Sequence, residues 1–243
     1  MFKKIYLLGL IILLFFPITT AFALNDNYTN KNGVKITKKE FDFINEFYGE
    51  EYFEKMTLDD YLWLKDLDIN NRKIEIKTVL DIPKISLYGT SISTVSKKLT
   101  IAKSCSSMCN ILVNTSWIQN PNNRSYDVIG ARFQNTSLAS NNIMTRVSSS
   151  GSNEYFSDNK ISNNGFGTSI KLPNAGSSIM IEQKFVVYKN GTVFASYQHS
   201  MQNISLSTSK LYTINSSGYG RVFAFYGNAS NIFDNMSGVD INV

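Results

Sequence analysis

The stretch VVYKNGTVF, residues 186–194, is the clearest indication of fold in this sequence. Two short runs rich in Val, Tyr and Phe, residue types that favour strands, are separated by the pair Asn190-Gly191. Asn-Gly is the preferred pair for a type I′ turn between two antiparallel strands. The stretch therefore predicts a β-hairpin.

Short apolar runs of the same kind recur through the rest of the chain. They cover residues 73–77, 85–94, 99–103, 110–118, 126–133, 179–188, 193–198, 211–214, 222–226 and 239–243. In the first of them Lys and Glu alternate with Ile, which is typical of a half-buried strand near a sheet edge. Because no long helical pattern accompanies these runs, we predict a mainly β chain, with an antiparallel β-sandwich over residues 73–243.

Residues 137–178 differ from the runs around them, because they are rich in Ser and Asn and hold few apolar residues. We expect long polar loops between sandwich strands here, where binding surfaces often lie. Exported pore-forming proteins also carry Ser/Thr-rich amphipathic hairpins, but these need alternation over about 9–11 residues per strand. Residues 143–147 alternate only briefly, so membrane activity stays an alternative.

Two copies of one helix-start pattern, 20 residues apart, lie ahead of the predicted sandwich. Thr37 is followed three residues later by Glu40, and Thr57 by Asp60, which is the spacing of a capping box. Apolar residues follow each start at helical spacing. Residues 24–72 therefore read as a small α-helical hairpin that packs an aromatic face on the sandwich. Helices with this spacing also dock on protein partners, with Trp63 as a possible anchor.

The first residues have the layout of a secretory signal peptide. Lys3 and Lys4 precede an apolar run at residues 5–16, and residues 21–23 form a small-x-small cleavage site. The run is shorter than the roughly 20 residues that a membrane helix needs. We predict cleavage after Ala23 and a secreted or cell-surface protein with no later transmembrane span.

Composition excludes several functional classes. Apolar residues make up 43% of the chain, as in folded globular proteins. The net charge of +5 falls to +3 without Lys3 and Lys4, and it is spread without runs. Such a distribution gives no electrostatic footprint for nucleic acid.

Cys105 and Cys109 are the only cysteines, and export permits a disulfide between them. Four residues of straight strand span about 13 Å, which exceeds the roughly 7 Å limit for a bridged pair. We therefore predict a disulfide that closes a tight turn or bulge at residues 106–108. Two thiols on neighbouring strands are the alternative.

Catalytic chemistry has little support in the sequence. The single histidine, His199, leaves no set of ligands for a metal site, and no G-x-S-x-G motif accompanies it. We expect no cofactor and read His199 as a hydrogen-bonded structural residue. A pair of carboxylates could still serve a glycosidase-like enzyme. The sequence does not show which of them meet.

The densest polar cluster of the predicted sandwich is Arg124, Tyr126 and Asp127, shortly after Trp117. Trp117 or Tyr126 would offer a stacking platform for a sugar, while Arg124 and Asp127 would offer hydrogen bonds. An Arg–Asp pair that bridges a loop is the structural alternative. We predict a secreted, non-enzymatic module that binds a cell-surface glycan or the cell wall, with a membrane-active β protein as the second hypothesis.

Overall fold

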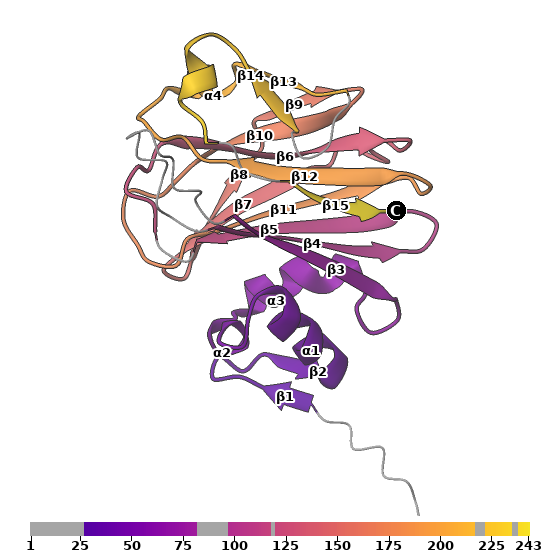
Figure 1. The fold of residues 1–243 in the computed structure, drawn as a ribbon. Helices are drawn as coiled ribbons and strands as arrows, with labels where there is room; N and C mark the ends of the chain where they lie inside the picture. Colours follow the sequence, from indigo (N-terminus) through magenta and orange to yellow (C-terminus); the bar gives the residue numbers. More distant parts are fainter. Residues whose placement is uncertain (1–26, 82–96, 118–119, 217–221, 235–237) are drawn as a thin grey trace, which may run out of the picture.

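The computed structural model describes residues 27–81, 97–117, 120–216, 222–234 and 238–243. The predicted signal peptide at residues 1–23 and the predicted strand at 85–94 lie outside these residues. Two antiparallel sheets face each other, and a small group of helices lies beneath one of them (Figure 1). The predicted architecture, a mainly β sandwich preceded by short helices, is therefore confirmed.

One sheet has six strands in the order β3-β4-β5-β11-β7-β8. Their bounds are Ile74–Asp81, Lys97–Cys105, Cys109–Trp117, Met180–Val187, Met144–Ser149 and Ser152–Phe156. The facing sheet has five strands in the order β15-β12-β6-β10-β9. Their bounds are Val239–Asn242, Thr192–Gln198, Tyr126–Gln134, Gly165–Lys171 and Asn159–Ser162. Strand β3 lies at a sheet edge, as its alternating Lys, Glu and Ile predict.

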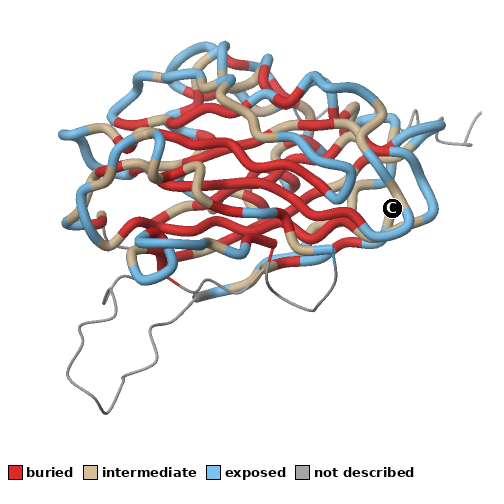
Figure 2. Tube along the Cα trace, turned by 90° about the horizontal axis from the view of Figure 1, so that it is seen from above, coloured by how far each residue is buried: buried red, intermediate tan, exposed pale blue. Residues whose placement is uncertain are grey.

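Period-two alternation builds the core between the sheets. Leu99 and Ile101 of β4 point inward with Ile129 and Ala131 of β6, and all four are fully buried. Figure 2 shows buried residues following the strands through the molecule, while exposed residues gather in the loops. A second apolar cluster covers the outer face of the five-stranded sheet with β13 (Tyr212–Ile214), β14 (Phe223–Phe225) and η3 (Gly227–Asn231), near the short helix α4 (Leu206–Ser209).

The outer face of the six-stranded sheet carries the helical unit, residues 27–67. It consists of β1 (Asn27–Thr29), β2 (Lys35–Thr37), α1 (Lys38–Phe47), α2 (Tyr52–Lys55), α3 (Leu58–Leu64) and η2 (Lys65–Leu67). Both predicted capping boxes are present, Thr37 with Glu40 and Thr57 with Asp60. Trp63 is buried in a cluster that includes Ala102 and Leu112 of the sheet. The short β1–β2 pair at its start was not predicted from sequence.

The hairpin predicted from VVYKNGTVF is wrong. Strands β11 and β12 flank Asn190-Gly191, but β11 pairs with β5 and β7 while β12 pairs with β6 and β15. The turn instead joins the two sheets, and the backbone N–H groups of Asn190 and Gly191 donate to the Val243 carbonyl at 2.7 and 3.2 Å. The sequence signal located a turn, since Asn190 has φ of 76°, but not the partners of its strands.

The loops predicted over residues 137–178 are also wrong. This span contributes β7 and β8 to one sheet and β9 and β10 to the other. Apolar residues are scarce because β8 and β9 are edge strands with much exposed surface, while β7 and β10 bury polar residues that bond to each other. The Thr145 hydroxyl of β7 donates to the Thr168 hydroxyl of β10 at 3.3 Å, and Gln183 of β11 donates to both at 2.9 Å.

The predicted disulfide is confirmed. Cys105 ends β4 and Cys109 begins β5, and the two residues are register partners in this hairpin. The Ser106 N–H donates to the Met108 carbonyl at 2.8 Å, so residues 106–108 form the tight turn that the spacing requires.

Candidate binding site

A cleft of about 570 Å³ lies where the helical unit meets one end of the six-stranded sheet. We call it the junction cleft. It is lined by residues of four separate segments: Tyr48, Glu51, Tyr52, Lys55, Thr57 and Asp60; Ser116 and Trp117; Ser148, Ser149, Ser150, Gly151 and Asn153; and Ser177, Ser178, Ile179 and Met180.

The helical wall of the junction cleft presents aromatic rings and carboxylates. The rings of Tyr48 and Tyr52 stack with centroids 4.1 Å apart and an interplanar angle of 12°. The capping box at the start of α3 fixes Asp60, whose Oδ2 accepts from the Thr57 N–H at 2.9 Å. Glu51 is exposed just before α2. Local helix-start chemistry therefore places these groups at the cleft.

The sheet wall is a neutral surface rich in hydroxyl groups. Ser150 and Gly151 form the tight β7–β8 turn, with φ of 51° and 85°, and Ser178 has φ of 60° just before β11. The Ser150 hydroxyl accepts from the Ser177 N–H at 3.2 Å, so the two loops that carry the serines are joined. This wall offers hydrogen-bond donors and acceptors without charge.

A fully buried ion pair lies directly behind the helical wall. Arg146 Nε is 2.5 Å from Glu182 Oε2, and Arg146 Nη1 is 3.1 Å from Asp60 Oδ1. The Tyr48 hydroxyl donates to Glu182. Burial raises the pKa of Glu182, with Arg146 opposing the shift, and burial together with Glu182 raises the pKa of Tyr48 well above its ordinary value. The pair therefore fixes both a tyrosine and an aspartate of the cleft.

Three residues of the cleft hold buried polar atoms without a hydrogen-bond partner of good geometry in the described part of the chain. They are the Tyr52 hydroxyl, the Trp117 indole N–H and the Ser149 hydroxyl. The Tyr52 hydroxyl lies near Arg146, and the indole N–H lies near the Tyr197 hydroxyl, without the alignment of a hydrogen bond. An unpaired buried polar group costs roughly 1–3 kcal/mol.

The four residues predicted from sequence do not form one surface. Trp117 lines the junction cleft, whereas Arg124 donates to the carbonyls of Pro173 and Gly176 at 3.2 and 3.1 Å. These two hydrogen bonds hold the loop that precedes serines 177 and 178 of the cleft. The ring of Tyr126 lies under the Lys171 ammonium, with Nζ 5.3 Å from the ring centroid. A ligand contact by any of these residues stays a prediction.

Asp127 is fully buried and belongs to an internal polar cluster. It accepts from the Tyr197 hydroxyl, from the Ser200 N–H at 2.9 Å and from the Ser200 hydroxyl at 3.0 Å. His199 Nδ1 lies 3.0 Å from Asp127 Oδ2, and the imidazole is almost fully buried. The serine thus bonds to the carboxylate and not to the imidazole, unlike the order of a hydrolase triad.

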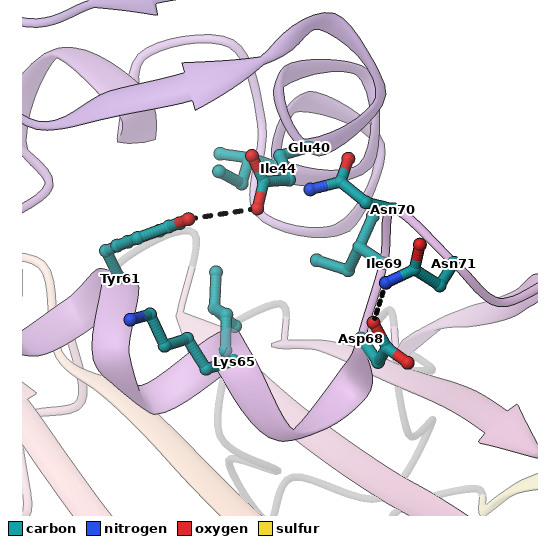
Figure 3. A pocket seen from close by; sticks show the side chains of 9 residues that line it. Glu40, Ile44, Tyr61, Lys65, Asp68, Ile69, Asn70 and Asn71 are labelled. Atoms are coloured by element: carbon teal, nitrogen blue, oxygen red, sulfur yellow. Dashed lines mark hydrogen bonds between the residues drawn. The ribbon is translucent and has the colours of Figure 1, made fainter.

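A smaller hollow of about 200 Å³ lies between α1, α3 and residues 68–71, which follow the helical unit (Figure 3). Its polar groups bind one another: Tyr61 donates to Glu40 at 3.1 Å, and Asn71 donates to Asp68 at 2.8 Å. The junction cleft, with its unpaired polar atoms and larger volume, is therefore the better candidate for a ligand site.

No group of three or more His, Cys, Asp or Glu side chains among the described residues is placed to hold a metal ion. No helix in the same part of the chain is long and apolar enough to cross a membrane.

Sequence reasoning identified Trp117 of the cleft and missed the rest. The capping-box signal at Thr57 and Asp60 was recognised, but it carried no hint that this helix start faces a cavity. From sequence, serines 148–150 and 177–178 are predicted only to be polar loop residues. Their convergence depends on strand pairing between β7, β8 and β11, which no local pattern specifies.

No known protein family and no curated protein matches this sequence. Among solved structures, the chain is similar to the collagen-binding domain of the Erysipelothrix rhusiopathiae surface protein RspB, at 10% identity and a TM-score of 0.29 over 70% of this chain and 58% of that one. It is also similar to the Streptococcus pneumoniae pilus backbone RrgB, at 11% identity and a TM-score of 0.26 over 53% and 32%. The T6 backbone pilin of Streptococcus pyogenes matches at 13% identity and a TM-score of 0.25 over 52% and 29%.

These structural neighbours are collagen-binding and pilus-backbone domains of bacterial surface proteins. The chain spans less than two thirds of the length of each. With TM-scores below 0.3, the likeness assigns this chain neither a family nor a ligand.

Proposed function

We propose that this protein is an exported, non-enzymatic binding module that holds a neutral surface glycan in the junction cleft. The observation that carries the proposal is the lining of the cleft, where the stacked rings of Tyr48 and Tyr52 line one wall and a row of serines lines the other. Its volume of about 570 Å³ falls within the usual range of small-molecule sites, roughly 300–1,000 Å³.

The chemistry of the lining selects for uncharged polyols. Sugar hydroxyl groups can pair with the serines and Asn153, and the apolar face of a sugar ring can pack on Tyr52. The charged residues of the lining are Glu51, Asp60 and Lys55. Glu51 pairs with Lys55 at 3.3 Å and Asp60 pairs with Arg146 at 3.1 Å. The lining therefore carries little unpaired charge and suits a neutral ligand better than a charged one.

The test is binding of the purified protein to a panel of immobilised neutral and acidic glycans and to insoluble cell wall. We expect retention on neutral glycans. Tyr52→Ala should weaken it about 5-fold, since one stacked ring contributes on the order of 1 kcal/mol. Tyr226→Ala is the matched control, because Tyr226 is an exposed tyrosine outside the cleft.

A second pair of variants tests whether the effect of a substitution near α2 is specific to residues that line the cleft. Glu51 lines the cleft, while Glu54, also exposed, does not. We expect Glu51→Ala, but not Glu54→Ala, to change retention. Equal binding by all four variants and the wild type would remove the cleft from consideration.

Membrane activity gains no support from the fold. Strands β7 and β10 lie within residues 137–178. Strand β7 pairs with β8 and β11 in the six-stranded sheet, and β10 pairs with β6 and β9 in the five-stranded sheet. Sedimentation with lipid vesicles serves as a parallel arm of the binding test. Pelleting with vesicles and not with glycans would favour the membrane-active hypothesis over the proposal.

A further inference from the structure

A lysine and an aspartate meet in the core at one end of the sandwich. Lys97 is 1% exposed and Asp234 8%, and Lys97 Nζ contacts Asp234 Oδ2. Lys97 is the first residue of β4 and points inward because it shares the alternation of Leu99 and Ile101. Asp234 lies between η3 and β15. The pair therefore joins a strand of one sheet to the segment that leads into an edge strand of the other.

Aromatic rings surround the lysine. Its Nζ lies 5.3 Å from the ring centroid of Trp117 and 5.8 Å from that of Tyr197. These rings limit the access of water to the pair. Without water, the ion pair is less strongly favoured in free energy over a neutral amine beside a neutral acid. Burial raises the pKa of Asp234, and Lys97 and His199 oppose the shift only in part. Burial thus shifts Asp234 toward the protonated acid, which is the form that amide formation requires.

The other carboxyl oxygen of Asp234 is also held. The backbone N–H of His199 donates to Asp234 Oδ1 at 2.8 Å, and the Asp234 N–H donates back to the His199 carbonyl at 2.9 Å. A fixed N–H on Oδ1 polarises the carboxyl group and stabilises negative charge on that oxygen. Oδ2, which contacts Lys97, is then the oxygen that can leave.

We propose that Lys97 and Asp234 join in an intramolecular isopeptide bond. The Lys97 ammonium first passes a proton to Oδ2. The neutral Nζ then attacks Cγ of Asp234 to form a C–N bond, while the negative charge that develops on Oδ1 is stabilised by the His199 N–H. Nζ loses a second proton to the leaving Oδ2, the Cγ–Oδ2 bond breaks, and one water is released. The step needs no oxidant, reductant or cofactor.

Peptide mapping of the reduced, full-length protein tests the bond directly. We expect one proteolytic fragment that joins the peptides around Lys97 and Asp234 and is lighter than their sum by one water. Recovery of the two peptides separately, each at its unmodified mass, would overturn the proposal. The ion pair Lys77–Asp240 is an internal control, because it also joins the two sheets but is half exposed. Its peptides should remain separate.

Variants distinguish the covalent bond from the ion pair. Lys97→Arg keeps a positive charge beside Asp234 but removes the amine, so the joined fragment should disappear. Asp234→Ala removes the carboxyl group and should have the same effect. Persistence of the joined fragment in either variant would show that another bond holds the peptides. The peptide map of the wild-type protein by itself decides whether the bond is present, so the proposal can be tested even if a variant fails to fold.

Discussion

Arg146 and Glu182 are register partners on the neighbouring strands β7 and β11, and both side chains are fully buried, with Nε and Oε2 2.5 Å apart. Arg146 also ion-pairs with Asp60 of α3, and its guanidinium carbon lies 4.4 Å from the Trp63 ring centroid. One arginine therefore couples two strands of the sheet to the helical unit. This coupling explains how a group of short helices is held against the sandwich.

Removal of one member of this pair should destabilise the protein strongly. Arg146→Met leaves Glu182 buried without its counter-charge, and such a change costs about 3–5 kcal/mol. The free energy of unfolding in urea measures it. Combining Arg146→Met with Glu182→Leu should recover a large part of the loss, because no buried charge is then unpaired. A double variant as unstable as the single one would contradict the argument.

The buried tyrosines predict a loss of stability in alkali. Burial and nearby carboxylates raise the pKa values of Tyr48 and Tyr197 well above the ordinary 10.0. Above pH 10 the unfolded chain releases these protons while the folded chain keeps them, so stability is complete below pH 10 and falls as pH rises beyond it. Each tyrosine contributes a slope of up to about 1.4 kcal/mol per pH unit.

Urea unfolding between pH 8 and pH 11 checks this prediction. Tyr48→Phe should flatten the alkaline loss, while Tyr188→Phe, at an exposed position, should follow the wild type. An unchanged slope in Tyr48→Phe would show that this phenol titrates freely in the folded protein.

The disulfide should stabilise the protein modestly. Cys105 and Cys109 close a very short loop, for which chain entropy gives about 2 kcal/mol. We expect the double variant Cys105→Ala/Cys109→Ala to lose that amount in urea unfolding and to keep the sandwich. Reduction of the wild type should reproduce the loss, and a reductant should not affect the variant. A much larger effect would mean that the bridge sets the β4–β5 register.

Each of the two helix caps should contribute to the stability of the protein independently of the other. Thr37→Ala and Thr57→Ala each remove a side-chain acceptor for the third helical N–H, at a cost of about 1 kcal/mol. Ser in place of either Thr keeps the oxygen and should restore stability. The free energy of unfolding of each variant provides the measurement. Equal losses in the Ser and Ala variants would assign the effect to packing of the Thr methyl group.

Sequence patterns that span a few residues predicted the structural features that depend on neighbouring residues. Both capping boxes, the disulfide turn and most of the strands depend on residues a few positions apart, and the sequence contains them. The Asn190-Gly191 turn was located, but the sheets on either side of it depend on pairing with β5, β6, β7 and β15. Pairing between distant strands leaves no trace in a local turn motif.

The candidate site was less predictable for the same reason. The junction cleft collects residues from 48 to 180, and its arrangement exists only after the sheet has formed. The buried pair could have been suspected by extending the alternation of Leu99 and Ile101 back to Lys97. A lysine at an inward position needs a counter-charge. The sequence does not reveal that Asp234 supplies it.

The contacts of the helical unit impose an order on folding. Its helices have their own start signals and can form early during synthesis, but some of the groups that hold them arrive late. The hydrogen bond from Tyr48 to Glu182 spans 134 positions, and Lys184 reaches Trp63 and Asp66 over a similar separation. The apolar face of the helices can pack on Ala102 and Leu112 once β4 and β5 have formed. The contacts with Glu182 and Lys184 must wait for β11, and loop closure over such a length slows this last step of docking. Until then the helical unit is held by only part of its contacts, which makes the nascent chain more vulnerable to aggregation.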